Sequence, residues 1–436
     1  MPLRLDISKP QFNAEFDRLL HTKREVSRDV NDAVAAILHA VAEKGDRAVI
    51  AYTEQFDRIA LTPDKLRISE AEIEDAIARC DKQSVAALQL AADRIEDYHR
   101  RQLPEDSLYT DENGVTLGAR WTAIGAVGLY VPGGTASYPS SVLMNALPCK
   151  VAGVPRRVMV MPTPDGTINP LTLLAARLGG VSEIYRIGGA QAVAALAYGT
   201  QTIAAVDKIT GPGNAFVAAA KRQVFGTVGI DMIAGPSEIL VVADNQNDPD
   251  WIAADLLSQA QHDASAQSIL ITDDARFAET VEKALQAHLD NLPRGAIARE
   301  SWENFGAIIR VDTLRQAGPL IDRIAPEHLE LAVADPQALL GTFRNAGAIF
   351  LGRFTPEAIG DYIAGPNHVL PTARAARYAS GLSVLDFMKR SSIIGCSAES
   401  LASIGAEAVT LARSEGLEAH ARSIAMRSNR ASGGSD

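Results

Sequence analysis

A glutamine and a histidine near the end of one predicted helix are the first residues that could do chemistry. The helix begins near Trp251, and its core-facing apolar stripe at helical spacing consists of Ile252, Ala253, Leu256, Leu257 and Ala260. Gln259 borders this stripe, and His262 follows three residues later on the same side. A buried carboxamide without a partner costs about 1–3 kcal/mol, so Gln259 needs one. A metal ion shared with His262 would supply it, and the plainer alternative is a backbone partner beside a surface histidine.

A second pair of titratable residues, Glu327 and His328, follows a predicted turn at Pro326. Adjacent side chains on a regular helix diverge by about 100°, so the two could flank one substrate instead of bonding each other. Such a pair suits two separate proton-transfer roles. Asp361 and His368 add a carboxylate and an imidazole within one short, loop-rich segment.

Further along the chain, Glu415 and His420 would lie about 140° apart on one helix, so they converge only if Glu415 lies in an irregular first turn. Each of these residues alone has an ordinary interpretation as a cap, a loop histidine or a solvated acid. Together they offer a set of nitrogen and oxygen ligands without sulfur, compatible with Zn²⁺ and also with Mn²⁺ or Co²⁺. That set is Gln259, His262, Asp361 and His420.

Composition limits the classes of protein to which this chain can belong. Its 436 residues are enough for two or three domains with a large core, and the net charge of −11 argues against a nucleic-acid or anionic-membrane footprint. Cys80, Cys149 and Cys396 form no CxxC pair, which indicates neither a disulfide framework nor a thiolate zinc site. Without an apolar leader or membrane-length run, the expected location is the cytoplasm, with small molecules as partners and no nucleic acid or membrane.

The pattern of apolar residues divides the sequence into two regions. Residues 9–101 are helical in pattern, with His21, His39 and His99 expected to be solvated. From residue 123 onward, short apolar runs alternate with alanine-rich helices, which predicts an α/β fold with two mostly parallel, helix-covered sheets. The predicted strands are Ala123–Val131, Arg157–Met161, Glu183–Ile187, Lys208–Thr210, Glu238–Ala243, Ser268–Thr272, Ala307–Val311 and Ala348–Leu351.

Glycine-rich turns follow several of these strands, at the edge where open α/β sheets bind ligands. They are Pro132–Gly134, Gly188–Gly189, Gly211–Gly213 and Gly235–Ser237. No GxGxxG fingerprint is present, so a conventional dinucleotide-binding motif is not predicted. The turn that leads through Asn214 into a helix over 215–223 is the best anion site, because a helix N-terminus offers free N–H groups.

Several of these stretches, in order, resemble the histidinol dehydrogenase family between about residue 25 and residue 427. The matching motifs are Gly211–Asn214, Ile233–Glu238, Ser258–His262, Ala325–Glu330, Gly365–Thr372 and Glu415–His420. The resemblance implies a zinc-dependent, NAD-linked enzyme that oxidises L-histidinol through L-histidinal to L-histidine. It also implies a homodimer whose C-terminal segment completes the neighbouring subunit's site.

The resemblance assigns roles residue by residue. Gln259, His262, Asp361 and His420 match zinc ligands, and Glu327 and His328 match an acid/base pair. The substrate contacts are Ser237, Gln259, His262, His328, Asp361, His368, Glu415 and His420, and the NAD contacts are Tyr130, Gln191 and Asn214.

The resemblance further implies two incomplete Rossmann-like sheets between small helical terminal segments. The expected parts are an N-terminal helical segment over 1–24, a first α/β domain over 25–129 and 239–380 with the metal and acid/base residues, a second over 130–238 on the NAD side, and a C-terminal helical segment over 381–436 ending in a disordered polar tail.

Three other functions remain open. A sister dehydrogenase could oxidise another small alcohol such as a sulfonated diol, but its substrate would call for arginine or lysine instead of Glu415 beside the metal. A metal-dependent hydrolase uses the same tools of zinc, glutamate and histidine. A non-catalytic binding protein would leave the polar cluster around Gln259 and Glu327 unexplained.

Overall fold

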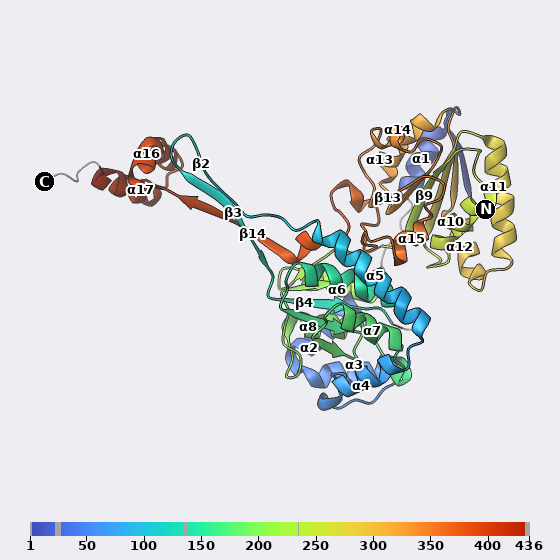
Figure 1. Ribbon diagram of the computed structural model, residues 1–436, viewed down its shortest axis with the longest axis horizontal. Coiled ribbons are helices and arrows are strands. Elements are labelled where there is room, and N and C mark those ends of the chain that lie inside the picture. The colour runs from blue at the N-terminus through green and yellow to red at the C-terminus, as the bar shows by residue number, and fades with distance from the viewer. Residues whose placement is uncertain (1, 22–27, 134–137, 234, 432–436) are drawn as a thin grey trace. The chain divides into compact units, whose positions relative to one another are not determined.

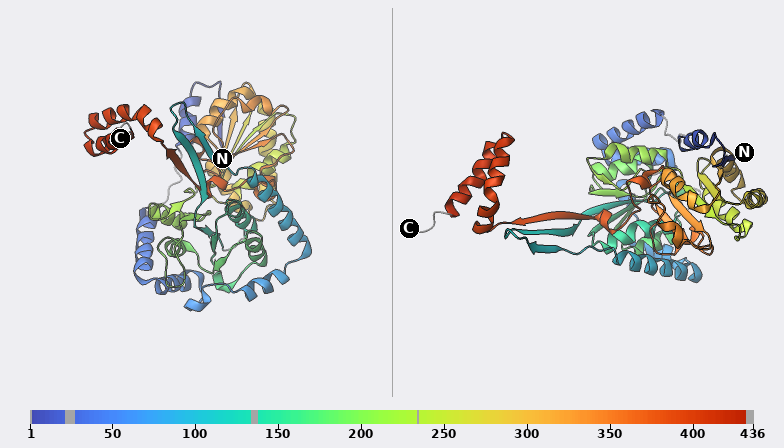
Figure 2. Two further views of the ribbon diagram at one scale, coloured as in Figure 1. Left: turned by 60° about the vertical axis from the view of Figure 1, so that its left-hand side comes forward. Right: turned by 90° about the horizontal axis from the view of Figure 1, so that it is seen from above.

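The computed structural model describes residues 2–21, 28–133, 138–233 and 235–431. The chain divides into two compact units (Figures 1 and 2). The large unit consists of residues 1–102 and 125–386, and the small unit of residues 103–124 and 387–436. Among the described residues, no helix combines the length and the hydropathy needed to cross a bilayer.

The first sheet of the large unit has six parallel strands in the order β1-β11-β10-β9-β12-β13. The strands are β1 (Leu3–Asp6), β9 (Glu238–Ala243), β10 (Gln267–Thr272), β11 (Ala307–Arg310), β12 (His328–Ala332) and β13 (Ala348–Leu351). Because side chains alternate along a strand, Leu240 and Val242 face one core, while Ile239 and Val241 face the other. The sheet is therefore buried on both faces, as a parallel sheet requires.

Helices cover these two faces. The core of Leu240 also holds side chains of α1 (Phe12–Leu20) and α13 (Ala317–Ile324). The opposite core is completed by α10 (Pro249–Ala260), α11 (Ala275–Leu289) and α12 (Gly295–Phe305). Figure 1 shows the two groups of helices on opposite sides of β9. Two short helices, α14 (Gln337–Leu340) and α15 (Glu357–Tyr362), follow β12 and β13.

The second sheet of the large unit has five parallel strands in the order β6-β5-β4-β7-β8. These are β4 (Ala126–Tyr130), β5 (Arg156–Val160), β6 (Glu183–Tyr185), β7 (Lys208–Thr210) and β8 (Gly229–Ile230). The connecting helices are α6 (Pro139–Val151), α7 (Pro170–Leu178), α8 (Gly189–Tyr198) and α9 (Ala215–Val224). The N-terminal helices α2 (Arg28–Lys44), α3 (Asp46–Asp57), α4 (Glu70–Ala78) and α5 (Lys82–Arg100) pack on these four.

The small unit is an antiparallel sheet followed by a helix pair. Its strands, in the order β14-β3-β2, are β14 (Met388–Gly395), β3 (Thr116–Ala123) and β2 (Ser107–Thr110). Helices α16 (Ala398–Ser414) and α17 (Glu418–Ala431) pack against each other, as Figure 2 shows.

The expected fold class is confirmed, since two parallel sheets with helices on their faces form the large unit. The predicted strands Lys208–Thr210, Glu238–Ala243 and Ala348–Leu351 have the observed bounds, and the other predicted parallel strands are right to within two residues, apart from Ala123–Val131. That run divides between the end of β3 and β4. The helices predicted near Trp251 and over 215–223 are α10 and α9.

The contacts group the chain differently from the expected domains. Helices α2 to α5 belong to the five-stranded sheet, not to the one that carries Glu327, and residues 103–124 pair with β14. The N-terminal segment contributes strand β1 as well as a helix, because Leu3–Asp6 pairs with β11. The expected boundary at 24/25, the end of the turn at Gly134 and the tail beyond Ala431 lie outside the described residues.

One histidine prediction was wrong. His21 and His39 are exposed, but His99 is fully buried, and its Nδ1 donates to the carbonyl oxygen of Ile95 at 2.7 Å. Burial lowers the pKa of His99. Charged neighbours in sequence misled the prediction because His99 lies on the inner face of α5, together with Ile95 and Ala92.

Candidate active site

Most of the predicted site residues line one cavity of about 1100 Å³ in the large unit. They are Asn214, Ser237, Gln259, His262, Glu327, His328, Asp361 and His368. Turns and helices that connect the strands of both sheets contribute to the wall of the cavity, together with His328 of β12. The geometry therefore gathers segments that lie more than a hundred residues apart in sequence.

The cavity uses opposite edges of the two sheets. The Gly211–Gly213 turn follows β7, at the carboxyl edge predicted for ligands. Ser237 and Glu327, however, immediately precede β9 and β12, and His328 is the first residue of β12. The turn over 235–237 was therefore placed at the wrong end of a strand by the sequence reasoning. Periodicity locates a strand but does not tell which of its ends faces the other sheet.

Gln259 is the buried polar residue that most clearly calls for a ligand. It is 1% exposed at the end of α10, and neither its Oε1 nor its Nε2 has a hydrogen-bond partner. An unsatisfied buried amide of this kind needs an explanation, such as an ion or a ligand. His262 follows the end of α10 and opens to the cavity, where Ser237 Oγ lies 3.3 Å from its Nδ1. Desolvation lowers the pKa of His262, which favours the neutral imidazole that binds metals.

Glu327 and His328 are held by the backbone of Glu238. The Glu238 N–H donates to Glu327 Oε2 at 2.9 Å, and His328 Nδ1 donates to the Glu238 carbonyl oxygen, also at 2.9 Å. Since Nδ1 is the donor, the second ring nitrogen of His328, Nε2, is the basic one. His328 begins a strand, so the helical divergence expected from sequence does not apply, and Nδ1 lies 3.6 Å from Glu327 Oε2.

Burial moves the pKa values of this pair toward each other. The pKa of Glu327 is raised well above its ordinary value, first by burial and then by the charge of Glu238. Burial lowers the pKa of His328, against the opposing charge of Glu357. A glutamate with a raised pKa is a stronger base once it has lost its proton. Both groups therefore have the placement and the tuning of acid–base residues.

Glu357 is a site residue that the sequence reasoning missed. It is 1% exposed at the start of α15, its Oε1 lies 3.5 Å from His328 Nε2, and its Oε2 accepts from Ser258 Oγ at 3.0 Å. Possible ligand atoms of His328, Glu357 and Asp361 lie within 4.8 Å of one another. Glu357 stands four residues before Asp361, so a helix would place both on one face, and this spacing is the signal that could have revealed it.

Asp361 lines the cavity and adjoins a group of carboxyl groups that are not part of the cavity wall. Burial and the charge of Glu357 raise the pKa of Asp361 to about 8. The same two causes raise the pKa of Asp255 to about 6, against a hydrogen bond with Glu330 that lowers it. The pKa of Glu330 is also raised, by burial and by the charge of Asp255. So many buried acids repel one another unless a cation joins them. The cluster thus favours a divalent metal or a cationic substrate.

His368 lies on the other side of Asp361. Its Nδ1 donates to the Asp361 carbonyl oxygen at 2.9 Å, and Ser141 Oγ lies 3.2 Å from its Nε2. Burial lowers the pKa of His368 to about 4, so it is neutral at physiological pH. A neutral imidazole with its ring fixed by two polar contacts suits the role of substrate contact.

The residues present fit a metal ion. Gln259 has two unsatisfied buried amide atoms, His262 has a lowered pKa, and the carboxyl group of Asp361 is held among other acids. These are the nitrogen and oxygen donors that zinc accepts in sites with an open position. The structure by itself groups Asp361 with His328 and Glu357, so the ligand set drawn from the sequence stays a prediction.

The expected NAD contacts occupy three different environments. Asn214 lines the cavity and caps α9, where its Oδ1 accepts from the N–H groups of Phe216 and Val217. Tyr130 and Gln191 are buried and are not part of the cavity wall, although the Tyr130 hydroxyl oxygen accepts from Gly189 N–H at 3.0 Å. Gln191 Oε1 has no partner. Of the three residues, Asn214 alone lines the cavity, and all three stay predicted NAD contacts.

Glu415 and His420 belong to the small unit. Glu415 ends α16 and His420 lies in α17, and both are exposed. Gly416 separates the two helices with a φ of 75°, so the angle expected for one continuous helix does not apply. Within this unit the described residues offer no group of histidine, cysteine and acidic side chains suited to a metal.

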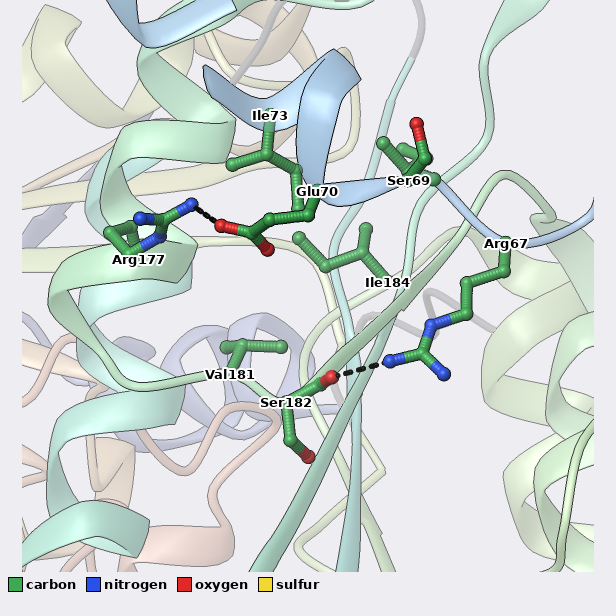
Figure 3. Close-up of a pocket in the computed structure, with 9 residues that line it drawn as sticks. Arg67, Ser69, Glu70, Ile73, Arg177, Val181, Ser182 and Ile184 are labelled. Carbon is green, nitrogen blue, oxygen red and sulfur yellow. Dashed lines mark hydrogen bonds and ion pairs between the residues drawn. The ribbon is translucent and has the colours of Figure 1, made fainter.

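A second, smaller pocket of about 170 Å³ lies beside α4 and α7 (Figure 3). Its guanidinium groups are already engaged, since Arg177 pairs with Glu70 and Arg67 donates to the Ser182 carbonyl oxygen. None of the predicted site residues lines it. The large cavity is therefore the candidate active site.

Because Asp361 is buried near other acids, we expect its carboxyl group to lower the stability of the metal-free protein at high pH. A raised carboxyl pKa means that the folded state keeps a proton that the unfolded state releases, so this group costs stability as pH rises from about 4 to about 8. In metal-free protein, Asp361→Asn should therefore raise the free energy of unfolding by roughly 1–3 kcal/mol at pH 8 and by little at pH 4. Urea unfolding with a chelator present measures this difference.

The exposed Asp97→Asn variant is the control, and it should change stability little at either pH. An Asp361→Asn protein that is less stable than the parent at pH 8 would contradict this account of the acid cluster.

Comparison with known proteins places this site in a family. The family model for histidinol dehydrogenase matches residues 20–428. The chain is 66% identical over 431 residues to the histidinol dehydrogenase of Rhodospirillum rubrum, covering 99% of both chains. It is 64% identical over 429 residues to that of Rhodopseudomonas palustris, covering 98% of this chain and all of the relative. The crystal structure of histidinol dehydrogenase from Elizabethkingia anophelis superposes with a TM-score of 0.93 at 35% identity, covering 98% of each chain. The chain therefore belongs to the histidinol dehydrogenase family.

Proposed function

We propose that the cavity catalyses the zinc-dependent, NAD-linked oxidation of L-histidinol through L-histidinal to L-histidine. Membership of the family makes the protein an oxidoreductase that acts on histidinol in histidine biosynthesis. The observation that supports a metal-assisted reaction here is the unsatisfied amide of buried Gln259, in the same cavity wall as Asp361 with its raised carboxyl pKa. The cytoplasmic location remains a prediction.

Four residues are proposed to hold the metal, namely Gln259, His262 and Asp361 of one chain and His420 of a second copy. Zinc bound there would act as a Lewis acid that fixes the imidazole and amine of the substrate. The acidic surroundings favour this cationic substrate, and neutral His368 and Ser237 are proposed to contact it. Exposed His420 and Glu415 in the small unit are consistent with donation to another subunit of a homodimer.

NAD, proposed to bind beside Tyr130, Gln191 and Asn214, would accept the hydride in each oxidation. His328 Nε2, the ring nitrogen that does not donate to Glu238, lies 3.5 Å from Glu357 Oε1 and is proposed to take the hydroxyl proton in each oxidation. A water must then add to the aldehyde before the second oxidation. Glu327, with its pKa raised by burial, is proposed to remove a proton from that water. The Glu238 backbone holds both residues in register for these steps.

The cavity also bears on the alternative functions. A sulfonated diol would require an available cation, yet Lys221 is the one lysine or arginine among the described residues that line the cavity, and it is paired with Asp231. Crowded acids would repel such an anion. A hydrolase would use the same residues without forming NADH.

Formation of NADH that depends on metal is the test of this function. Purified protein with L-histidinol and NAD should give rising absorbance at 340 nm, and exhaustive chelation should abolish it until Zn²⁺ is restored. Metal affinity should weaken as pH falls below about 8, because the carboxyl group of Asp361, whose pKa is raised to about 8, must lose its proton to bind. Full activity in protein shown to be metal-free would contradict the proposal, and hydrolysis without NADH would favour the hydrolase.

A further inference from the structure

A buried ion pair between Lys221 and Asp231 lies in the wall of the cavity. Lys221 belongs to α9, and Asp231 directly follows β8. Their side chains are 3% and 1% exposed, and both residues contribute to the wall beside the Gly211–Asn214 turn. None of the acid–base or metal roles described above involves this pair, so its place in the site needs a separate explanation.

The ion pair binds both backbone groups of Gly211. The Gly211 N–H donates to Asp231 Oδ2 at 2.8 Å, and Lys221 Nζ donates to the Gly211 carbonyl oxygen at 2.9 Å. Gly211 has a φ of +114°, and a Cβ at this position would lie 2.0 Å from the Tyr130 carbonyl oxygen. The start of the turn is thus fixed between the end of β4 and the ion pair, in a conformation open only to glycine.

The position of Asn214 depends on the position of Gly211. Asn214 stands three residues after Gly211 and caps α9, the same helix that carries Lys221. Asp231 is also tied to the sheet, because its N–H donates to the Ile209 carbonyl oxygen of β7 at 3.2 Å. The pair therefore links helix, turn and sheet around the residue proposed to contact the cofactor.

Stability alone is a poor reason to bury these charges. Desolvation offsets most of the attraction in a buried ion pair, and replacing both partners with apolar residues is often neutral or stabilising. The hydrogen bonds to Gly211, by contrast, are lost in any such replacement. The ion pair therefore serves to hold the backbone of the Gly211–Asn214 turn in its conformation.

We propose that Lys221 and Asp231 are positioning residues that hold the Gly211–Asn214 turn in the shape that receives NAD, an inference that rests on the proposed NAD-linked function. The test replaces both partners together, in Lys221→Met/Asp231→Leu, so that neither charge is left buried alone. The KM and the Kd for NAD should rise roughly 10–100-fold, as expected for small misplacements at a binding site. The kcat at saturating NAD, the KM for L-histidinol and the bound zinc should change less than about threefold.

A graded variant keeps the test valid if the first one folds poorly. Lys221→Met/Asp231→Asn retains an oxygen that can accept from the Gly211 N–H, so its KM for NAD should lie between those of the parent and the apolar pair. The matched control is Arg156→Met/Glu183→Gln, which removes an ion pair of 2.7 Å at the starts of β5 and β6, in the same sheet but outside the cavity wall. This control should leave the KM for NAD unchanged.

The outcomes separate this inference from the proposed function. Folded variants that bind NAD with the parent's Kd, or that lose kcat and the affinities for NAD, L-histidinol and zinc alike, would overturn the positioning role while the parent's NADH formation stands. A control pair that raises the KM for NAD as much as the apolar pair does would overturn it as well. Titration with NAD alone reports the Kd even if L-histidinol is not oxidised, so a failure of the proposed function leaves the inference testable.

Discussion

Replacing Glu327 with glutamine should slow the oxidation of supplied L-histidinal by about 10²–10⁴-fold and slow the oxidation of L-histidinol to the aldehyde much less. The amide keeps the shape of the side chain but cannot remove a proton from the water that adds to the aldehyde. His328→Asn should slow both oxidations, because we assign the proton transfers of both steps to Nε2 of this ring. Single-turnover NADH formation from each substrate measures the two effects separately.

The structure explains why these two residues should differ. Glu327 is held through Oε2 by the Glu238 N–H, whereas His328 donates from Nδ1 and keeps Nε2 for chemistry. Glu330→Gln is the matched control: Glu330 lies in β12, two residues after His328, and is buried with a raised pKa, but it is not part of the cavity wall. It should retain most activity. If Glu327→Gln oxidised L-histidinal at the parent's rate, water activation would have to be reassigned to another group.

Mixing two inactive proteins, His262→Ala and His420→Ala, should restore activity from background to about a quarter of the parent's value. Random exchange makes about half of the dimers mixed, and each mixed dimer would hold one intact site if His420 is donated across a two-fold interface. His262 lines the cavity of the large unit, and His420 is exposed in the small unit. The assay is NADH formation after subunit exchange.

The control mixes His262→Ala with Asp361→Asn, two lesions in the same cavity, and exchange should restore nothing. Exchange itself can be followed by native mass spectrometry of differently tagged chains. A mixture that exchanges fully but stays inactive in the His262→Ala and His420→Ala pair would place the complete site within one chain.

The sequence predicted the positions of helices and strands better than it predicted which edge of a sheet lines the cavity or which side chains meet there. Buried strands such as Glu238–Ala243 are continuous apolar runs, and their bounds were predicted correctly. Strand β12 was missed because His328 and Glu330 interrupt its apolar pattern, although both side chains are buried. The residues of the cavity were found from motif resemblance and from residue types that need partners. From its immediate sequence neighbours alone, each of these residues could equally be a helix cap, a loop histidine or a solvated acid.

Other features depend on tertiary packing and could not be read from local patterns. Glu357 follows Pro356 at the start of α15, where an acid is usually exposed, yet it is buried against His328 and Ser258. His99 looked solvated, yet it faces the core of the large unit. Ser237 and Glu327 lie at the amino-terminal edge of the six-stranded sheet. That this edge lines the cavity depends on how the two sheets assemble, which no short stretch of sequence encodes.

The stoichiometry of NADH formation tests the central claim most directly. With excess NAD and limiting L-histidinol, the account predicts two NADH for each L-histidinol consumed, with L-histidine as the product, because the two oxidations and the intervening addition of water occur in one cavity. One NADH for each L-histidinol, with the aldehyde accumulating, would contradict the proposed role of Glu327 and the four-electron reaction.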